Sequence, residues 1–296
     1  ASNPPRFSPG GGGGGGPTGA PQPELLAGVL RIPRCLCANW GKEGKEREAF
    51  ILLMEMLGKP DWVHVDPELG CSKEQAVTAA EALGKMHKAF SDKKILDELS
   101  WLPVTVFDVR NAEQMQQWFS MIVEQAGTLV QMLPPSAQKA VDRMAQGGFG
   151  ECFVRLGRPP LTLNHGDYRP ENLRFSAPGQ PPAVAAFDWG LVNCARGVAD
   201  FAYFLMLSQP PEQRRQWEQE LLEKYLRARG DYSESAMRET REDLKSASIS
   251  ILGMILMTRQ GATHSCTQGT RIMLSRMMRW VGEAIMDWGS IDVLPL

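Results

Sequence analysis

The sequence predicts an α+β protein in which a small β region precedes a mostly helical body. Between positions 33 and 57, two short apolar stretches flank a charged segment that contains glycine, which is the pattern of two antiparallel strands joined by an exposed loop. After position 72, several long segments place apolar residues at helical spacing. Two short β-like pieces, LTLNHGD at 161–167 and AVAAFDW at 183–189, interrupt this helical body.

The composition limits the size of the hydrophobic core and the kinds of partner that the protein could bind. The chain has 296 residues, of which 43% are hydrophobic and 22% charged, with a formal net charge of -2. This is enough for one large core or two modest ones, and no concentrated basic face indicates nucleic acid or an anionic membrane. The longest apolar run, 248–257, is shorter than the ~18 residues of a membrane span. We therefore expect a buried helix there, no nucleic-acid or membrane partner, and an oligomeric state that the sequence leaves open.

Six cysteines are scattered along the chain. This usage is typical of reduced thiols in an intracellular protein, so we expect a cytoplasmic location. Cys35 and Cys37 could form half of a metal site, but no second pair of Cys or His residues is spaced to complete it.

Residues 1–23 are expected to form a disordered tail because they are rich in Gly and Pro and have little to bury. Seven consecutive glycines at 10–16 suggest a phosphate-binding loop at first sight. Such loops place a few glycines at set positions after a strand, with a Lys nearby, and neither condition is met here. We interpret the run as part of a linker-like tail.

Helical spacing is clearest at 73–90, where Ser72 and Gln75 form a plausible capping box. His87 on this helix is expected to be a core or hinge-facing residue. Further helices are predicted at 112–133, 135–156 (with a break near 147–150), 198–208, 212–230, 233–258 and 269–288. Gly230 is placed to end one of them.

The central segment HGDYRPEN and the following FDWG carry the chemistry. Asp167 is followed by Asn172 five residues later and by Asp188 sixteen residues beyond that. Phosphoryl transfer depends mainly on positioning and charge neutralisation, with one carboxylate that orients the attacking hydroxyl and oxygen ligands that hold Mg²⁺. Asp167 suits the catalytic role, and Asn172 and Asp188 suit the metal role.

These residues reproduce the order of a kinase catalytic loop followed by an Asp-x-Gly triplet. Gly166 stands where protein kinases have Arg, and Trp189 stands where they have Phe. With these differences the sequence resembles the aminoglycoside phosphotransferase and choline kinase-like superfamily. The resemblance extends from about position 33 to the C-terminus and implies a protein-kinase-like fold, with ATP as co-substrate and Mg²⁺ as cofactor.

The resemblance also implies a domain organisation. Residues 24–60 would be a remnant of the N-lobe with its last strands and hinge, and residues 61–296 the helical C-lobe. The catalytic loop would span 163–175 and the metal-binding segment 184–190. The backbone of Glu55, Met56 and Leu57 would lie at the hinge that contacts adenine.

Four further residues are expected to support the site. By resemblance, His165 buttresses the catalytic loop through hydrogen bonds, and Asp200 begins a helix and braces the same loop. Trp189 is expected to pack and to set the position of Asp188. Arg169 either contacts phosphate or substrate or pairs with an acidic neighbour.

The N-lobe predicted from the sequence is short. Only about thirty residues separate the tail from Met54, which is room for two strands, and no Lys follows an apolar strand as the nucleotide-binding Lys of kinases does. We therefore expect the nucleotide lid to be missing and the chain to be an incomplete copy of a working kinase. The alternative is a lidless kinase-like module that binds a ligand or partner without efficient catalysis. A metal-dependent hydrolase built on the same carboxylates is a third hypothesis.

The expected function is therefore ATP-dependent transfer of the γ-phosphate to a hydroxyl of a small molecule. The sequence leaves the acceptor open. A cationic acceptor would need acidic or aromatic walls, and the C-terminal helices offer Glu223, Asp243, Trp217 and Trp280 for them.

Overall fold

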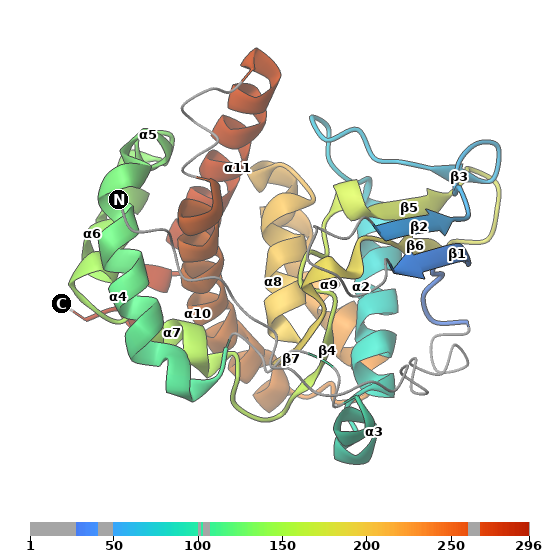
Figure 1. The fold of residues 1–296 in the computed structure, drawn as a ribbon, viewed down its shortest axis with the longest axis horizontal. Coiled ribbons are helices and arrows are strands. Elements are labelled where there is room, and N and C mark those ends of the chain that lie inside the picture. Colours follow the sequence, from blue (N-terminus) through green and yellow to red (C-terminus); the bar gives the residue numbers. More distant parts are fainter. Residues whose placement is uncertain (1–27, 41–49, 100–101, 103–106, 260–266, 296) are drawn as a thin grey trace.

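The β region lies at one end of the helical body, so the architecture is α+β, as the sequence predicts (Figure 1). The computed structural model describes residues 28–40, 50–99, 102, 107–259 and 267–295. The predicted disordered tail at 1–23 and the predicted loop between the first two strands lie outside these residues.

The first two strands form an antiparallel hairpin, which confirms the prediction for residues 33–57. β1 (Cys35–Trp40) pairs with β2 (Phe50–Met54), with Ala38 opposite Leu52. Apolar side chains on this hairpin are exposed, including Leu53 at 55%. The hairpin therefore adds little to the core, which lies among the helices.

A second sheet, in the order β3-β5-β6, brings the predicted metal ligands together. β5 (Leu173–Ser176) pairs antiparallel with β6 (Val184–Ala186), and β3 (Trp62–Val63) pairs with the other side of β5. β5 begins directly after Asn172, and β6 ends two residues before Asp188. Both residues therefore lie at the same end of the sheet.

A third strand pair frames the catalytic loop. β4 (Thr162–Asn164) leads into His165, and β7 (Asn193–Ala195) pairs with it antiparallel. The two predicted β-like pieces thus belong to different sheets, and each has a short partner strand that the sequence analysis did not find. Strands of three or four residues give too little alternation to be recognised.

The helix α2 (Lys73–Ala89) begins at the predicted capping box. Ser72 Oγ accepts from the Gln75 N–H at 3.2 Å, and the Ser72 N–H donates to Gln75 Oε1 at 2.9 Å. α2 packs closely on α9 (Pro211–Arg229), because a Cβ at Gly84 would lie 2.4 Å from the Tyr225 carbonyl oxygen. Gly230 follows α9 with a φ of 90° and ends it, as predicted.

The predicted helix at 112–133 is divided in the structure, which corrects the prediction. It consists of α4 (Ala112–Ile122), a 3₁₀ turn (Val123–Ala126) and α5 (Gly127–Val130). The tighter turn begins with Val123 and is flanked by Ile122 and Gly127. Two β-branched residues and a glycine are poor helix formers, so the α-helix gives way to a 3₁₀ turn here.

The predicted break in the next helix is confirmed. α6 (Pro135–Gln146) and α7 (Phe149–Arg155) are separated by two glycines with positive φ, 151° at Gly147 and 83° at Gly148. The short helix α3 (Lys93–Glu98) and 3₁₀ turns at Val109–Asn111 and Ser290–Val293 complete the connections.

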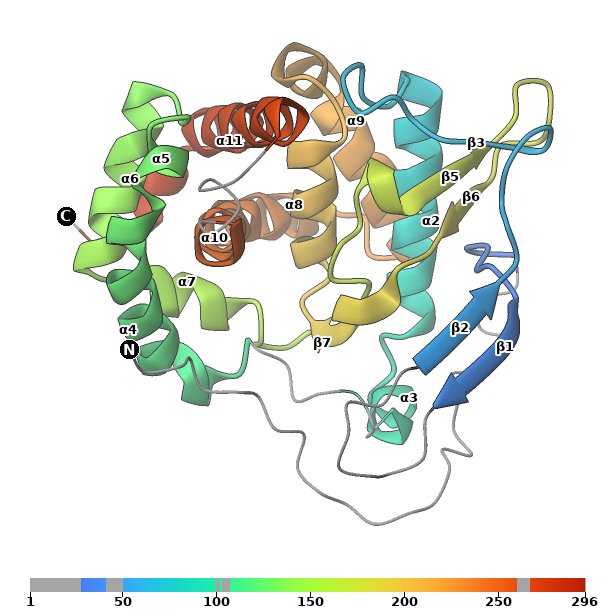
Figure 2. The same ribbon diagram turned by 45° about the horizontal axis from the view of Figure 1, so that its top comes forward.

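The centre of the body is formed by α8 (Val198–Leu207), α10 (Glu234–Arg259) and α11 (Gln268–Asp287) (Figure 2). The apolar run at 248–257 lies within α10 and is largely buried, as predicted. Among the described residues, no helix has the length and apolar character that crossing a bilayer requires.

Candidate active site

Asp167 and Asn172 are in direct contact. A 3₁₀ turn (Pro170–Asn172) returns the chain after Asp167, so that Asn172 Nδ2 donates to Asp167 Oδ2 at 2.7 Å and to the Asp167 carbonyl at 3.0 Å. Because the amide nitrogen faces Asp167, Asn172 Oδ1 points the other way. This oxygen accepts none of the hydrogen bonds found among the described residues. The spacing of five residues thus places a carboxylate beside a free amide oxygen.

Asp188 adopts a left-handed backbone conformation, with φ 62° and ψ 61°. It is the one non-glycine residue with positive φ in the described part of the chain. Its carboxylate is exposed and has no hydrogen-bond or ion-pair partner among the described residues. Aspartate tolerates this conformation better than most residues, but such positions cluster at functional sites.

The Asn172 amide oxygen and the Asp188 carboxylate are a donor set that fits a divalent cation. The two residues are linked through the sheet end, where the Phe187 N–H donates to the Asn172 carbonyl at 3.1 Å. Mg²⁺ prefers oxygen ligands, keeps several waters and is commonly shared between one or two side chains and substrate phosphates. Two unpaired oxygen donors at one edge therefore suit a metal that also contacts a nucleotide.

His165 joins the two halves of the motif from a fully buried position. Its Nδ1 accepts from the Asp167 N–H at 3.2 Å, and its Nε2 lies 2.9 Å from the Phe187 carbonyl, which can only accept. The bonded pattern therefore requires a neutral imidazole with its proton on Nε2. The Trp189 ring lies 4.5 Å from the His165 ring, and its Nε1 donates to the Ala186 carbonyl at 3.3 Å.

Asp200, buried in the first turn of α8, holds the backbone that precedes Asp167. Its Oδ2 accepts from the His165 N–H at 2.6 Å and its Oδ1 from the Gly166 N–H at 2.9 Å. Gly166 has a φ of 85°, and a Cβ there would lie 2.1 Å from the Leu191 carbonyl oxygen. The catalytic loop is thus fixed by a carboxylate on one side and by close backbone packing on the other.

Arg169 pairs with acidic neighbours, which was one of the two roles expected for it. Its Nε lies 2.9 Å from Asp167 Oδ1 without the alignment of a hydrogen bond, and its Nη1 lies 3.8 Å from Glu171. Glu171 also lies 3.7 Å from Arg276 on α11. The guanidinium therefore neutralises and orients the Asp167 carboxylate in this structure.

Glu55, the first of the predicted hinge residues, is linked through Arg31 to the strand that leads to Asp188. Glu55 accepts from the Arg34 N–H at 3.0 Å and pairs with Arg31 at 2.5 Å. These contacts lower the pKa of Glu55 below its ordinary value, with the Arg34 hydrogen bond as the largest cause. Arg31 in turn forms a parallel bridge with Ala185 on β6. Within the described part of the chain, no hydrogen bond or ion pair joins Glu55, Met56 or Leu57 directly to Asp167, Asn172 or Asp188.

A cavity of about 470 Å³ opens beside Asp167. Its walls come from α8, α10 and α11 and are mainly apolar, with Tyr203, Ile251, Met254, Ile255 and Met277 among them. Burial and the nearby Asp167 carboxylate raise the pKa of Tyr203, so this residue stays a phenol that faces Asp167. The sequence analysis missed Tyr203, because only the motif-like order of the polar residues carried a signal.

The residues available for a cationic acceptor do not form this cavity. Glu223, Trp217 and Trp280 are absent from its described walls, and Asp243 is buried against Arg155 at 2.9 Å. Arg259, at the end of α10, lines the cavity and has no ion-pair partner among the described residues. The carboxylates on its described walls, Asp167 and Asp200, both have partners, so Arg259 is the unpaired charge of this cavity.

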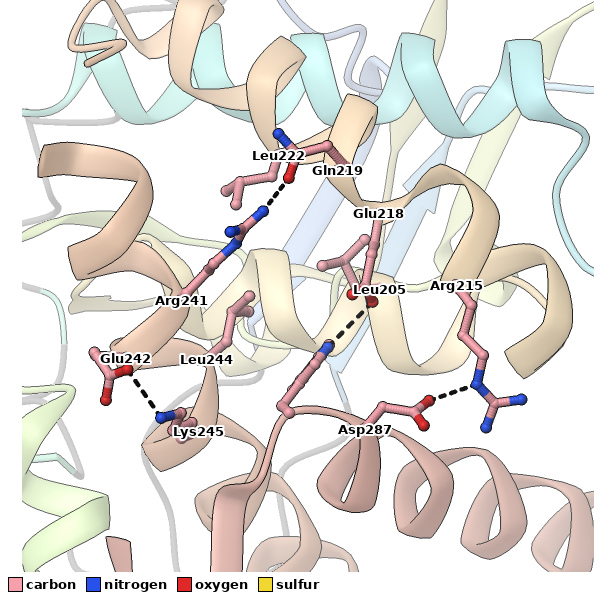
Figure 3. A pocket seen from close by; sticks show the side chains of 11 residues that line it. Leu205, Arg215, Glu218, Gln219, Leu222, Arg241, Glu242, Leu244, Lys245 and Asp287 are labelled. Atoms are coloured by element: carbon pink, nitrogen blue, oxygen red, sulfur yellow. Dashed lines mark hydrogen bonds and ion pairs between the residues drawn. The ribbon is translucent and has the colours of Figure 1, made fainter. Parts of the chain in front are cut away.

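A second cavity of about 430 Å³ lies between α8, α9, α10 and the end of α11 (Figure 3). Its charged side chains are directed at one another. Arg215 bonds Asp287 at 2.8 Å, Lys245 bonds Glu242 at 2.9 Å, and Arg241 bonds Gln219 (Figure 3). This cavity contains none of the motif residues, so the candidate site is the one beside Asp167.

Comparison with known proteins identifies the family. A model of the ecdysteroid kinase-like family matches residues 27–234, which is most of the chain. The protein belongs to the ecdysteroid kinase-like family. No curated protein matches it significantly. Membership confirms the predicted relation to the aminoglycoside phosphotransferase and choline kinase-like superfamily, and with it a kinase-type protein.

Solved structures show that this member of the ecdysteroid kinase-like family has a protein-kinase-like fold. A structure of amicoumacin kinase with AMP-PNP, Ca²⁺ and amicoumacin is similar, with a TM-score of 0.54 at 12% identity, over 88% of this chain and 74% of that one. A Ralstonia eutropha protein described as an aminoglycoside phosphotransferase gives 0.56 at 16% identity, over 92% and 82%. Plasmodium vivax ethanolamine kinase gives 0.52 at 12% identity, over 90% and 69%.

Proposed function

We propose that the protein is an ATP-dependent kinase that transfers the γ-phosphate to a hydroxyl of a small molecule. One observation carries the proposal: Asp167 lies at the wall of a mainly apolar cavity and contacts Asn172, whose free oxygen lies at the same sheet end as the free carboxylate of Asp188. This arrangement supports a role for Asp167 as proton acceptor, with space for an acceptor molecule on one side and two oxygen donors for a metal on the other.

In this proposal Asp167 orients the acceptor hydroxyl and takes its proton as the bond to the γ-phosphorus forms and the bond from that phosphorus to the β-phosphate oxygen breaks, which releases ADP. Arg169 and Asn172 hold the carboxylate in one rotamer, which favours a single approach of the hydroxyl. His165 and Asp200 hold the backbone around it. The backbone of Glu55 to Leu57 is proposed as the segment that contacts adenine.

Asn172 Oδ1 and the Asp188 carboxylate would hold Mg²⁺. When bound, the cation neutralises charge on the phosphate oxygens. Amicoumacin kinase, similar in fold, was solved with AMP-PNP and Ca²⁺, which supports a nucleotide held together with a divalent cation in this fold.

The acceptor that the cavity favours is an apolar alcohol without positive charge. Its walls are mainly aliphatic and aromatic, its unpaired charge is the cation Arg259, and both carboxylates on its described walls, Asp167 and Asp200, are already paired or hydrogen-bonded, so neither is free for an ammonium group. A volume of about 470 Å³ is sufficient for a rigid polycyclic alcohol. The name of the ecdysteroid kinase-like family agrees with a steroid-like alcohol of this kind.

The roles of the two carboxylates are tested by separate isosteric changes. Asp167→Asn should leave Mg·ATP binding unchanged and lower kcat for transfer by roughly two to four orders of magnitude, because the proton acceptor is lost. Asp188→Asn should weaken Mg·ATP binding itself, because Asn keeps the left-handed backbone but lacks the charge. Calorimetry and a coupled ADP-release assay with a polycyclic alcohol measure the two effects.

Asp97→Asn, an exposed change on α3, is the control and should alter neither quantity. Equal turnover in the unsubstituted protein and both active-site variants would contradict the mechanism. Acceptor binding without any transfer, in a protein that also fails to bind Mg·ATP, would instead favour the lidless binding module.

A further inference from the structure

A chain of buried polar side chains lies beneath the catalytic loop, and the proposed chemistry does not use it. His87 on α2 and Tyr225 on α9 are fully buried, and Asp200 on α8 is 2% exposed. His87 Nδ1 lies 2.9 Å from the Tyr225 hydroxyl, and His87 Nε2 lies 3.7 Å from Asp200 Oδ2. Three helices thus contribute one side chain each to a line that ends at Asp200.

The direction of the hydrogen bonds along this line is set by Arg229, which lies at the end opposite Asp200. Arg229 Nη1, which can only donate, lies 3.3 Å from the Tyr225 hydroxyl, and Arg229 Nε is held by Asp231 at 2.9 Å. Burial raises the pKa of Tyr225 to about 12, so it keeps its proton and donates it to His87 Nδ1. The proton of His87 is therefore on Nε2, directed at Asp200.

His87 Nε2 depends on Asp200 for a partner. It is buried and has no hydrogen-bond partner within the described part of the chain. The Asp200 carboxylate, with Oδ2 3.7 Å away, is the acceptor that it faces. Burial lowers the pKa of His87, which keeps it neutral, while Asp200 favours its proton. A buried N–H that faced no acceptor would be strongly destabilising. The electrostatic attraction between this N–H and Asp200 Oδ2 therefore helps to hold the Asp200 carboxylate in place.

The close approach of His87 and Tyr225 is built into the helix that carries Asp200. A Cβ at Gly197, the residue before α8, would lie 2.5 Å from His87 Nδ1 and 2.7 Å from the Tyr225 hydroxyl. The Tyr225 ring is also stacked on Phe201 with centroids 4.4 Å apart. Only glycine allows this contact three residues before Asp200.

We propose that His87 and Tyr225 are positioning residues for phosphoryl transfer, which act on Asp167 through Asp200. The Asp200 carboxylate accepts the N–H groups of His165 and Gly166 at 2.6 and 2.9 Å, and these are the two residues before Asp167. A displacement of Asp200 is therefore transmitted to the catalytic carboxylate. The inference rests on the proposed kinase function, and it assigns α2 and α9 a part in that function.

Tyr225→Phe is the informative change because it removes one oxygen and keeps the ring stacked on Phe201. We expect kcat to fall on the order of tenfold, as small misplacements of a reacting group do, with the KM values for ATP and acceptor unchanged. His87→Gln places an amide N–H near the position of Nε2 and should retain most of the activity, whereas His87→Leu should lose more than Tyr225→Phe.

Ser248→Ala is the matched control. It also removes a buried hydroxyl hydrogen bond, to Ser290 at 2.8 Å, but from helix α10. It should lower the melting temperature about as much as Tyr225→Phe does and leave kcat unchanged. A Tyr225→Phe protein with the kcat of the control would overturn the proposal, because its role would then be packing alone.

Amide hydrogen exchange provides a readout that does not depend on activity. Tyr225→Phe should accelerate exchange at the His165 and Gly166 amides, which donate to Asp200, and Ser248→Ala should not. If the unsubstituted protein transfers no phosphate to any alcohol, the proposed function fails while this readout still decides the positioning role. Unchanged exchange at both amides in Tyr225→Phe would overturn the inference.

Discussion

At the scale of single residues, the site depends on two left-handed backbone positions that lie in separate segments. Gly166 precedes Asp167, the proposed proton acceptor, and approaches the backbone of Leu191, and Asp188 begins the turn that leads to Leu191. His165 bonds the backbone of both segments. The relative position of Asp167 and Asp188 is therefore set by backbone contacts and by one neutral imidazole, and long flexible side chains have little part in it.

The close contact at Gly166 predicts that a substitution there lowers the free energy of unfolding, and the same substitution at Gly179 serves as the comparison. Gly166→Ala introduces a Cβ 2.1 Å from the Leu191 carbonyl at a φ of 85°. Gly179→Ala has a similar φ of 87° but no atom within 4 Å of the added Cβ. We expect Gly179→Ala to lower the free energy of unfolding by ~1 kcal/mol from backbone strain alone, and Gly166→Ala to lower it by roughly 2–4 kcal/mol because crowding is added.

Urea denaturation of both variants measures the difference, and the transfer assay follows its effect on the site. Since Gly166 adjoins Asp167, its variant should also lose kcat, whereas the Gly179 variant should keep it. Equal destabilisation by the two changes would show that the backbone around Leu191 moves easily and that the site is less rigid than its contacts indicate.

At the scale of elements, α10 is the wall that separates the apolar cavity from the rest of the body. Met254 lines the cavity, whereas Met257, less than one turn further on, is half-buried outside it. Met254→Trp should fill the cavity and raise the KM for a polycyclic alcohol at least tenfold, with the KM for ATP unchanged.

Met257→Trp makes the same chemical change at a position outside the cavity, so it should leave both KM values near those of the unsubstituted protein. Steady-state kinetics with the alcohol varied at fixed ATP provides the comparison. If both variants bind the alcohol as before, the acceptor lies somewhere other than the cavity beside Asp167.

Elements were predictable from the sequence where their signals are local. The start of α2 follows from Ser72 and Gln75, and the end of α9 follows from Gly230, because both signals lie within a few residues of the boundary. The division of the 112–133 segment was missed because β-branched residues and a single glycine disfavour a helix only weakly. The pairing of β4 with β7 was not predictable because it joins segments about thirty residues apart.

At the scale of the whole molecule, the site likewise contains residues that local sequence signals indicate and residues that only tertiary packing reveals. Asp167, Asn172 and Asp188 could be selected from the sequence because their order and spacing carry the signal. Tyr203 and Tyr225 could not, because each reaches the site from a helix and only the tertiary packing of α8 and α9 shows it. The sequence thus predicts the reacting groups and the supports His165 and Asp200, and the structure adds the cavity and the side chains that reach the site from distant helices.

Stability is also unevenly distributed over the molecule. The helical body buries its apolar side chains, including Leu83 on α2 at 0% exposure, whereas the β1–β2 hairpin leaves Leu53 55% exposed. The same change at the two positions should therefore differ greatly. Leu83→Ala should lower the free energy of unfolding by about 2–5 kcal/mol, and Leu53→Ala by less than about 0.5 kcal/mol.

Chemical denaturation of the two variants, with hydrogen exchange of the unsubstituted protein, tests this distribution. The amides of β1 and β2 should exchange through local opening well before those of α2 and α9, because few buried apolar contacts hold the hairpin. A loss at Leu53 as large as that at Leu83 would show that the hairpin is covered in solution. In that case the stability loss should grow with protein concentration if a second copy provides the cover, and sedimentation of the Leu53→Ala protein would detect the change.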